Sequence, residues 1–122
     1  MNDADLCSIR QLARMNRVFV SAHALQRFIE RNISLQDAHG ILKSENNCLI
    51  ERQAPSTTVG KEHKDPRYLV YDKTVNPEVI VVCAISFNGP NQLPDINIVT
   101  AERVDNCKWN RQYDKDPPLI RK

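Results

Sequence analysis

Apolar residues recur every three or four positions in the first third of the chain. Three segments show this period: Asp5–Asn16, Ser21–Asn32 and Ser34–Ser44. The period predicts three amphipathic helices. The second and third segments begin with serine, a typical N-cap residue, since its hydroxyl accepts hydrogen bonds from the free amides of a first helical turn. Val18–Val20, between the first two helices, is expected to be a brief extended piece.

From position 47 onward the apolar residues alternate with polar ones or run continuously, as in β-strands. Four segments have this character: Asn47–Gln53, Arg67–Asp72, Glu78–Phe87 and Asp95–Val104. The third is the most hydrophobic, so we expect it near the centre of a sheet. The short connections favour an antiparallel meander. The pattern therefore predicts an α+β fold, with N-terminal helices on one face of an antiparallel sheet of about four strands.

The chain of 122 residues suits a single domain. We expect an N-terminal helix over 1–17, the helix pair and sheet over 18–109, and an irregular tail over 110–122. The longest apolar run, 79–87, is far shorter than the roughly 20 residues of a membrane span. The acidic N-terminus lacks the apolar core of a secretory signal. These features predict a soluble protein with no membrane partner.

The net charge is only +2, but the charges are unevenly distributed. Residues 10–31 hold five arginines and one acid, and residues 103–122 hold six bases and three acids. The middle, 32–102, holds six bases and nine acids. If the two ends meet in space, they form a basic surface that attracts phosphates. The alternative is that basic ends only aid solubility.

The cysteines and glycines give no sign of a cofactor. Cys7, Cys48, Cys83 and Cys107 are widely spaced, without a CxxC pair or metal-ligand spacing to a histidine. We expect all four to be reduced and Cys83, within an apolar run, to be a buried thiol. The three glycines form no glycine-rich phosphate loop, which makes an enzyme acting on free nucleotides the weakest hypothesis.

The second predicted helix carries a candidate site. His23, Arg27 and Arg31 are four residues apart and therefore share one side of the helix. A histidine transfers protons near neutral pH, and arginines hold a phosphate or stabilise charge developing on it. Ordinary roles remain open. His23 could anchor the helix to the sheet, and Arg27 could form an ion pair with Glu30 or Glu51. Arg31 could be present only because the helix dipole favours any cation near the C-terminus.

Three further residues are noticeable but are expected to be structural. His39 is predicted on a helix surface and His63 in the polar loop between the first two strands, neither with an evident partner. Trp109 is expected to be a packing anchor rather than a platform for a base.

Four stretches in order, SAHALQRFIERNISLQDAHGIL, RYLVYD, VIVVCAIS and NIVTAERVDNCKW, resemble a bacterial family of domains of unknown function. That family opens with a histidine, an arginine and Arg-polar-Ile-Ser/Thr. It ends in a strand with a threonine, followed by a short segment with tryptophan. In plan it is similar to RelE-type toxins, within the superfamily that joins barnase, EndoU, colicin nucleases and RelE. The resemblance covers about Val18 to Trp109.

The resemblance implies a sheet with one face open to RNA and edged by the N-terminal helices. It implies a toxin that cleaves RNA without a metal, through attack by the ribose 2′-hydroxyl. His23, Arg27, Arg31 and Thr100 match the family motif and would be the catalytic residues. RNA would be the substrate, and an antitoxin or immunity protein would be a further partner. The site of action would be the cytoplasm, of its own cell or of a target cell.

Three more residues are candidates for substrate binding. Tyr68 and Tyr71 lie on a predicted strand and could stack on a base or bond a phosphate. Where the resembling family often has Thr-x-Tyr, this chain has Glu102 two residues after Thr100. Glu102 would either repel phosphate or act as a general base with His23 as the acid. The near-neutral charge and Glu102 support a second hypothesis, a non-catalytic module that binds protein or nucleic acid, such as a phage or host regulatory factor.

Overall fold

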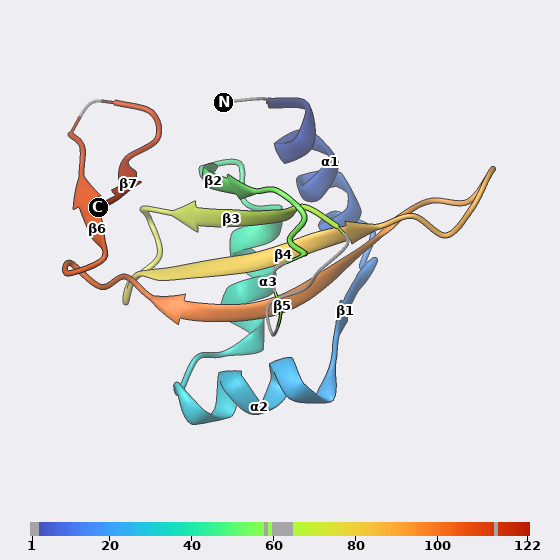
Figure 1. Cartoon of the computed structure of the whole chain (residues 1–122), viewed down its shortest axis with the longest axis horizontal. Helices are drawn as coiled ribbons and strands as arrows, with labels where there is room; N and C mark the ends of the chain where they lie inside the picture. The colour runs from blue at the N-terminus through green and yellow to red at the C-terminus, as the bar shows by residue number, and fades with distance from the viewer. Residues whose placement is uncertain (1–2, 58, 60–64, 114) are drawn as a thin grey trace.

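The structure is a computed structural model and describes residues 3–57, 59, 65–113 and 115–122. His63 lies outside the described residues. The predicted helices and strands form within two residues of the expected bounds. In chain order the elements are α1 Asp3–Arg14, β1 Val18–Val20, α2 Ala22–Glu30, α3 Leu35–Lys43, β2 Asn47–Gln53, β3 Arg67–Asp72, β4 Val79–Ser86, β5 Asp95–Arg103, β6 Trp109–Arg111 and β7 Leu119–Arg121 (Figure 1).

The main sheet has the strand order β1-β5-β4-β3-β2, with β1 parallel to β5 and every other pair antiparallel. This confirms the α+β class. The sheet has five strands rather than about four, because Val18–Val20 pairs with the first half of β5 as a parallel edge strand. β4, the most apolar segment, is central as expected, with β5 and β3 as its neighbours.

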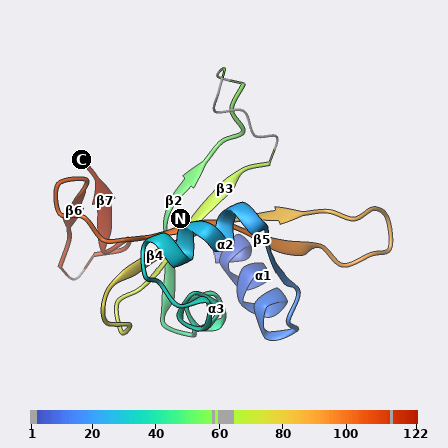
Figure 2. The ribbon, with the colours of Figure 1, turned by 90° about the horizontal axis from the view of Figure 1, so that it is seen from below.

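Helices α1 and α3 pack on one face of the sheet (Figure 2). Ile9 of α1 and Ile41 and Leu42 of α3 are fully buried there against strand residues such as Val81. Cys83 belongs to the same core, as its apolar surroundings predicted, and burial raises the pKa of its thiol to about 12. We call this the helix-covered face of the sheet, and the opposite side the open face.

Helix α2 lies along the edge of β5 rather than on a face of the sheet (Figure 1). Strand β1 pairs only with residues 96–98 of β5, which leaves the later half of that edge for α2. Ser21 caps the helix as predicted, since its hydroxyl accepts from the amide of Ala24. The helix is held against the core by Phe28, which is buried.

The expectation of an irregular tail was wrong. β6 and β7 pair as an antiparallel hairpin on the open face of the sheet (Figure 1). Trp109 and Leu119 are buried there in a second apolar cluster with residues of β2, β3 and β4. Trp109 is therefore a packing anchor, as predicted. Among the residues that the structure describes, no helix is long and apolar enough to cross a membrane.

Candidate functional site

The strand register places Thr100 on the open face. Thr100 is opposite Val82 of β4, which is opposite Leu69 of β3, and cross-strand partners point to the same side of a sheet. Leu69 and Val82 belong to the cluster under the hairpin, on the side away from α1 and α3. Glu102, two residues after Thr100, is opposite Ile80 of the same cluster. Thr100 and Glu102 therefore share the open face beside the hairpin.

Arg31, the C-cap residue of α2, reaches this face. Its Nη1 donates to Thr100 Oγ1 at 2.9 Å and to the carbonyl oxygen of Ala101 at 2.7 Å. The second bond satisfies a carbonyl on the part of β5 that β1 leaves unpaired. Arg31 therefore anchors the end of α2 to β5. Arg27 and His23 share the side of α2 that carries Arg31 by their spacing, and of the three residues it is Arg31 that contacts Thr100.

Arg27 lies one turn and His23 two turns before Arg31. His23 and Arg31 are therefore about 12 Å apart along the helix axis. Arg27 is half-buried and His23 is exposed. Within the described part of the chain neither side chain has a hydrogen bond or an ion pair. The two acids considered as partners for Arg27 are engaged elsewhere. Glu30 accepts from Gln26 at 3.1 Å, and Glu51 receives two hydrogen bonds of 2.8 Å from Arg121.

Glu102 lies at the other end of the site, near the hairpin. Glu102 is half-buried. The hydrogen bond to Glu51 is the main cause that raises the pKa of Arg121, and the charge of Glu102 makes the smallest contribution. The guanidinium of Arg121 lies over the ring of Trp109 at 4.6 Å from the ring centre. Glu102 is thus close to a cation that already has an acidic partner.

The two tyrosines are not brought to the arginines of α2. Tyr68 points into the helix-covered face, where it is buried, and Arg52 lies over its ring at 5.7 Å. Tyr71 is on the open face but under the hairpin, and its hydroxyl donates to Glu78. Burial, followed by the bond to Glu78, raises the pKa of Tyr71 to about 12. Tyr68 therefore packs in the core, whereas Tyr71 packs under the hairpin and also lines a pocket there.

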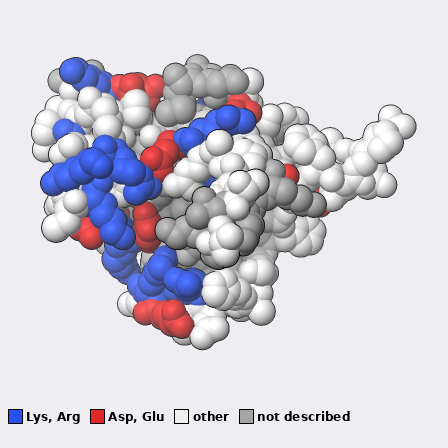
Figure 3. All heavy atoms as spheres, in the orientation of Figure 1, with Lys and Arg blue, Asp and Glu red and all other residues white. Residues whose placement is uncertain are grey.

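Basic residues of α2 and of the C-terminal hairpin lie on the same side of the molecule. Lys and Arg side chains gather over the β6–β7 hairpin and continue down to α2, with acidic side chains between them (Figure 3). The two basic ends therefore meet only in part, because Arg10 and Arg14 lie on α1 at the helix-covered face and Arg17 pairs with Asp95. Individual hairpin residues such as Arg111 and Arg121 were not predicted, although the count of bases after position 103 was the signal for them.

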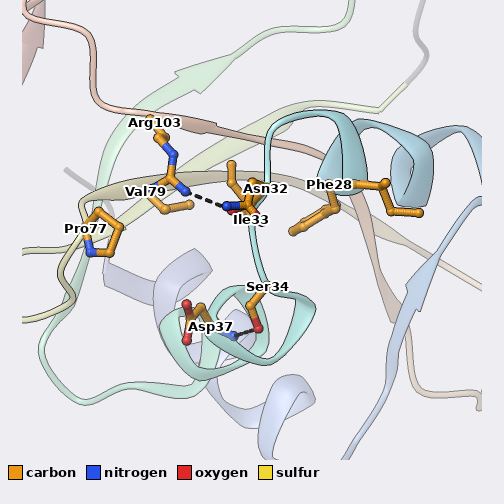
Figure 4. A pocket seen from close by; sticks show the side chains of 9 residues that line it. Phe28, Asn32, Ile33, Ser34, Asp37, Pro77, Val79 and Arg103 are labelled. Carbon is orange, nitrogen blue, oxygen red and sulfur yellow. Dashed lines mark hydrogen bonds between the residues drawn. The ribbon is translucent and has the colours of Figure 1, made fainter.

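A pocket of about 570 Å³ lies on the other side of α2 and was not predicted (Figure 4). Phe28, Ile29 and Val79 contribute its apolar lining, and Asp37 is on its rim. Arg103 closes one side by donating to the carbonyl oxygen of Asn32 at 2.8 Å. Arg31 and Arg103 therefore hold the end of α2 to β5 from the two faces of the sheet. Among the residues that the structure describes, no group of three His, Cys, Asp or Glu side chains could hold a metal ion.

Comparison with protein families gives one match. The model of a family described as a domain of unknown function, DUF4258, matches residues 20–103. The matched region begins at the end of β1 and ends with β5, so it contains His23, Arg27, Arg31 and Thr100 but not the β6–β7 hairpin. No curated protein and no solved structure matches the chain.

Proposed function

The chain belongs to the family of domains of unknown function DUF4258, and we propose that it is an endoribonuclease that cleaves RNA without a metal, at a phosphate site formed by α2 and the edge of β5. The observation that carries the proposal is which of three side chains on one side of α2, two arginines and a histidine, have hydrogen-bond partners within the protein. Arg31 is fixed on Thr100, while Arg27 one turn earlier and His23 two turns earlier have no partner in the described part of the chain. Unpaired basic groups next to a fixed one suit a phosphate ligand.

The substrate phosphate would bind to Arg27 and to the donors of Arg31 that its protein contacts leave over. Arg31 uses only Nη1 toward Thr100 and Ala101, so Nε and Nη2 remain for a phosphate oxygen. Thr100 holds the guanidinium in one orientation, which reduces the ordering cost on binding. Arg27, which is half-buried, would face the same phosphate from the preceding turn of α2.

The proposed reaction is an attack of the ribose 2′-hydroxyl oxygen on the adjacent phosphorus. The bond from phosphorus to the 5′-oxygen of the next nucleotide breaks, which gives a 2′,3′-cyclic phosphate and a 5′-hydroxyl. His23, one turn from Arg27, would transfer the proton, and Arg27 would stabilise the charge on the phosphate oxygens. Glu102 lies beyond Thr100 toward the hairpin and near Arg121, while His23 is two helical turns before Arg31, so we assign Glu102 to a neighbouring nucleotide rather than to the proton transfer.

The test uses purified protein and a structured RNA, with products analysed for cyclic phosphate ends. Wild-type protein is expected to cut, and His23→Ala and Arg27→Ala to lower the rate by about a hundredfold or more. His39→Ala on α3 and Arg14→Ala on α1 are matched controls, since both residues lie away from this site, and they should cut like wild type. Intact RNA at micromolar wild-type protein would refute the proposal.

In a cell, we propose that the enzyme acts as a toxin in the cytoplasm and is neutralised by an antitoxin or immunity protein. Expression of wild-type protein is then expected to arrest growth, and the double variant His23→Ala/Arg27→Ala to relieve the arrest. Tolerated expression of an RNA-cleaving wild-type protein would remove the toxin role but not the enzymatic one.

A second function, a binding module without catalysis, is favoured by the acids on the same face. Glu51 and Glu78 neutralise Arg121 and Arg111 of the hairpin, and Glu102 lies next to Thr100. If this function is correct, RNA stays intact and a stable complex with protein or nucleic acid is recovered from cells. Recovery of RNA cleavage dependent on His23 would exclude it.

A further inference from the structure

A second pocket, of about 450 Å³, lies between the end of β3 and the β6–β7 hairpin. Its lining includes Lys73, Arg111, Tyr113, Lys115 and Asp116. Most of these residues belong to the hairpin or to the connection between its strands, outside the region matched by the family. Most of the pocket therefore lies outside the region that the family model matches.

One wall of the pocket is held in place by packing and charge. The hairpin docks through Trp109 and Leu119, both buried. Arg111 donates to the two carboxylate oxygens of Glu78 at 2.8 and 2.6 Å, and Glu78 also accepts from the hydroxyl of Tyr71. Two parallel bonds to a carboxylate fix the plane of a guanidinium. The charge of Arg111 is balanced by Glu78, so the ligand-binding charge of this pocket must come from other residues.

Two lysines supply that charge. Lys73 directly follows β3 and Lys115 lies in the connection between β6 and β7. Both are exposed, and in the part of the chain that the structure describes neither has a hydrogen bond or an ion pair. Asp116 offsets one of them, which leaves the lining with an excess of positive charge. Two unpaired ammonium groups at one pocket favour an anionic ligand.

The same pocket presents an aromatic ring. Tyr113 is 83% exposed, more than any other aromatic residue that the structure describes. A tyrosine ring next to free cations is the combination that binds single-stranded nucleic acid, because a base stacks on the ring while the cations hold the backbone. A free phosphate or an acidic peptide would use the lysines but not the ring.

We propose that this pocket binds one nucleotide unit of single-stranded RNA, with its base on Tyr113 and its phosphate on Lys73 and Lys115. The inference rests on the proposed function for the choice of RNA as ligand. The basic surface of Figure 3 runs from the hairpin to α2, so a strand bound at the pocket reaches the site at Thr100 along one face of the molecule. The pocket would position RNA and would not take part in the chemistry.

The test measures binding of a fluorescent 2′-O-methyl RNA, which lacks the attacking hydroxyl and stays intact. The association constant falls as the salt concentration rises. Loss of two phosphate-binding lysines in Lys73→Ala/Lys115→Ala is expected to make the slope of its logarithm against log salt less steep by about 1.4. Tyr113→Ala should weaken binding roughly fivefold or more. The matched control Arg14→Ala/Lys43→Ala removes two charges from α1 and α3 and should leave the slope close to wild type. An unchanged slope in Lys73→Ala/Lys115→Ala, or no binding by wild type, would overturn the inference.

Cleavage assays separate this inference from the proposed function. If wild type binds the modified RNA through the lysines but leaves unmodified RNA intact, the proposed enzyme activity fails and the binding pocket stands. If wild type cleaves RNA with dependence on His23 but the double lysine variant binds as wild type does, the pocket fails and the enzyme stands. Trp109, the single tryptophan, packs between the hairpin and the main sheet, so its unchanged emission in each variant shows that the hairpin is still docked.

Discussion

Arg31 shows what a sequence can and cannot specify about a single residue. Spacing alone placed it on one side of a helix with His23 and Arg27, and the structure has it there. Its partners, Thr100 and Ala101, are about seventy positions later, and only the docking of α2 on the edge of β5 brings them into reach. The proposed pairing of Arg27 with Glu51 failed for the same reason, since the hairpin supplies Arg121 to that acid.

The anchoring role of Arg31 predicts a measurable difference between the two arginines. Arg31→Ala should lower the free energy of unfolding by about 1.5–3 kcal/mol, because it removes charged hydrogen bonds to Thr100 and Ala101. Thr100→Val, which leaves the bond to Ala101, should cost less. Arg27→Ala should stay within about 0.5 kcal/mol of wild type, as for a surface change without a partner. Urea unfolding measures all three, and an equal cost for Arg27→Ala and Arg31→Ala would contradict these roles.

Among the elements, β2 and β3 were predicted with the bounds that the structure shows, because their apolar residues form clear runs. The β6–β7 hairpin was missed. Each of its strands has three residues, too few for alternation to be visible, and its stability comes from Trp109 and Leu119 packing on distant strands. The parallel pairing of β1 with β5 was equally hidden, since a three-residue strand does not specify its partner.

Two ion pairs that hold the hairpin predict acid sensitivity. The hydrogen bonds from Arg121 and Arg111 are the largest causes that hold the pKa values of Glu51 and Glu78 below their usual range. A carboxyl whose pKa is lower in the folded state stabilises the fold above its unfolded pKa, about 4.3 for glutamate. That contribution is lost as the pH falls through the lower, folded pKa. The unfolding free energy of wild type should therefore fall below about pH 4.

The matched variant Glu51→Gln/Glu78→Gln isolates this effect. It should be less stable than wild type at pH 7 and should lose less stability on acidification, because its two side chains no longer titrate. The emission of Trp109, which lies under Arg121, reports whether the hairpin stays docked during the titration. Equal losses for wild type and the double variant between pH 6 and pH 3 would show that other groups control the acid response.

At the scale of the whole molecule, the sequence shows how charges are distributed along the chain but not where they lie on the folded surface. Counting bases near the two ends suggested a basic surface only on the condition that the ends meet. The fold meets that condition in part, since α2 at the edge of β5 and the hairpin on the open face lie on one side of the molecule, while the arginines of α1 lie on the other (Figures 1 and 3). The apolar pocket beside Phe28 and Arg103 lies on the other side of α2. The molecule thus has a polar and an apolar candidate surface on opposite sides of one helix.

This separation lets one experiment distinguish an RNA ligand from a protein partner. Hydrogen exchange with 2′-O-methyl RNA should slow the amides at the end of β5 and in the connection between β6 and β7, and leave those of α1 unchanged. A protein partner that inserts an apolar side chain beside Ile29 would instead slow the amides at the start of α3, next to the pocket of Figure 4. The variant Lys73→Ala/Lys115→Ala should lose the RNA effect at the hairpin and keep it at β5. Protection by RNA restricted to α1 and α3 would contradict the assignment of the open face as the nucleic-acid surface.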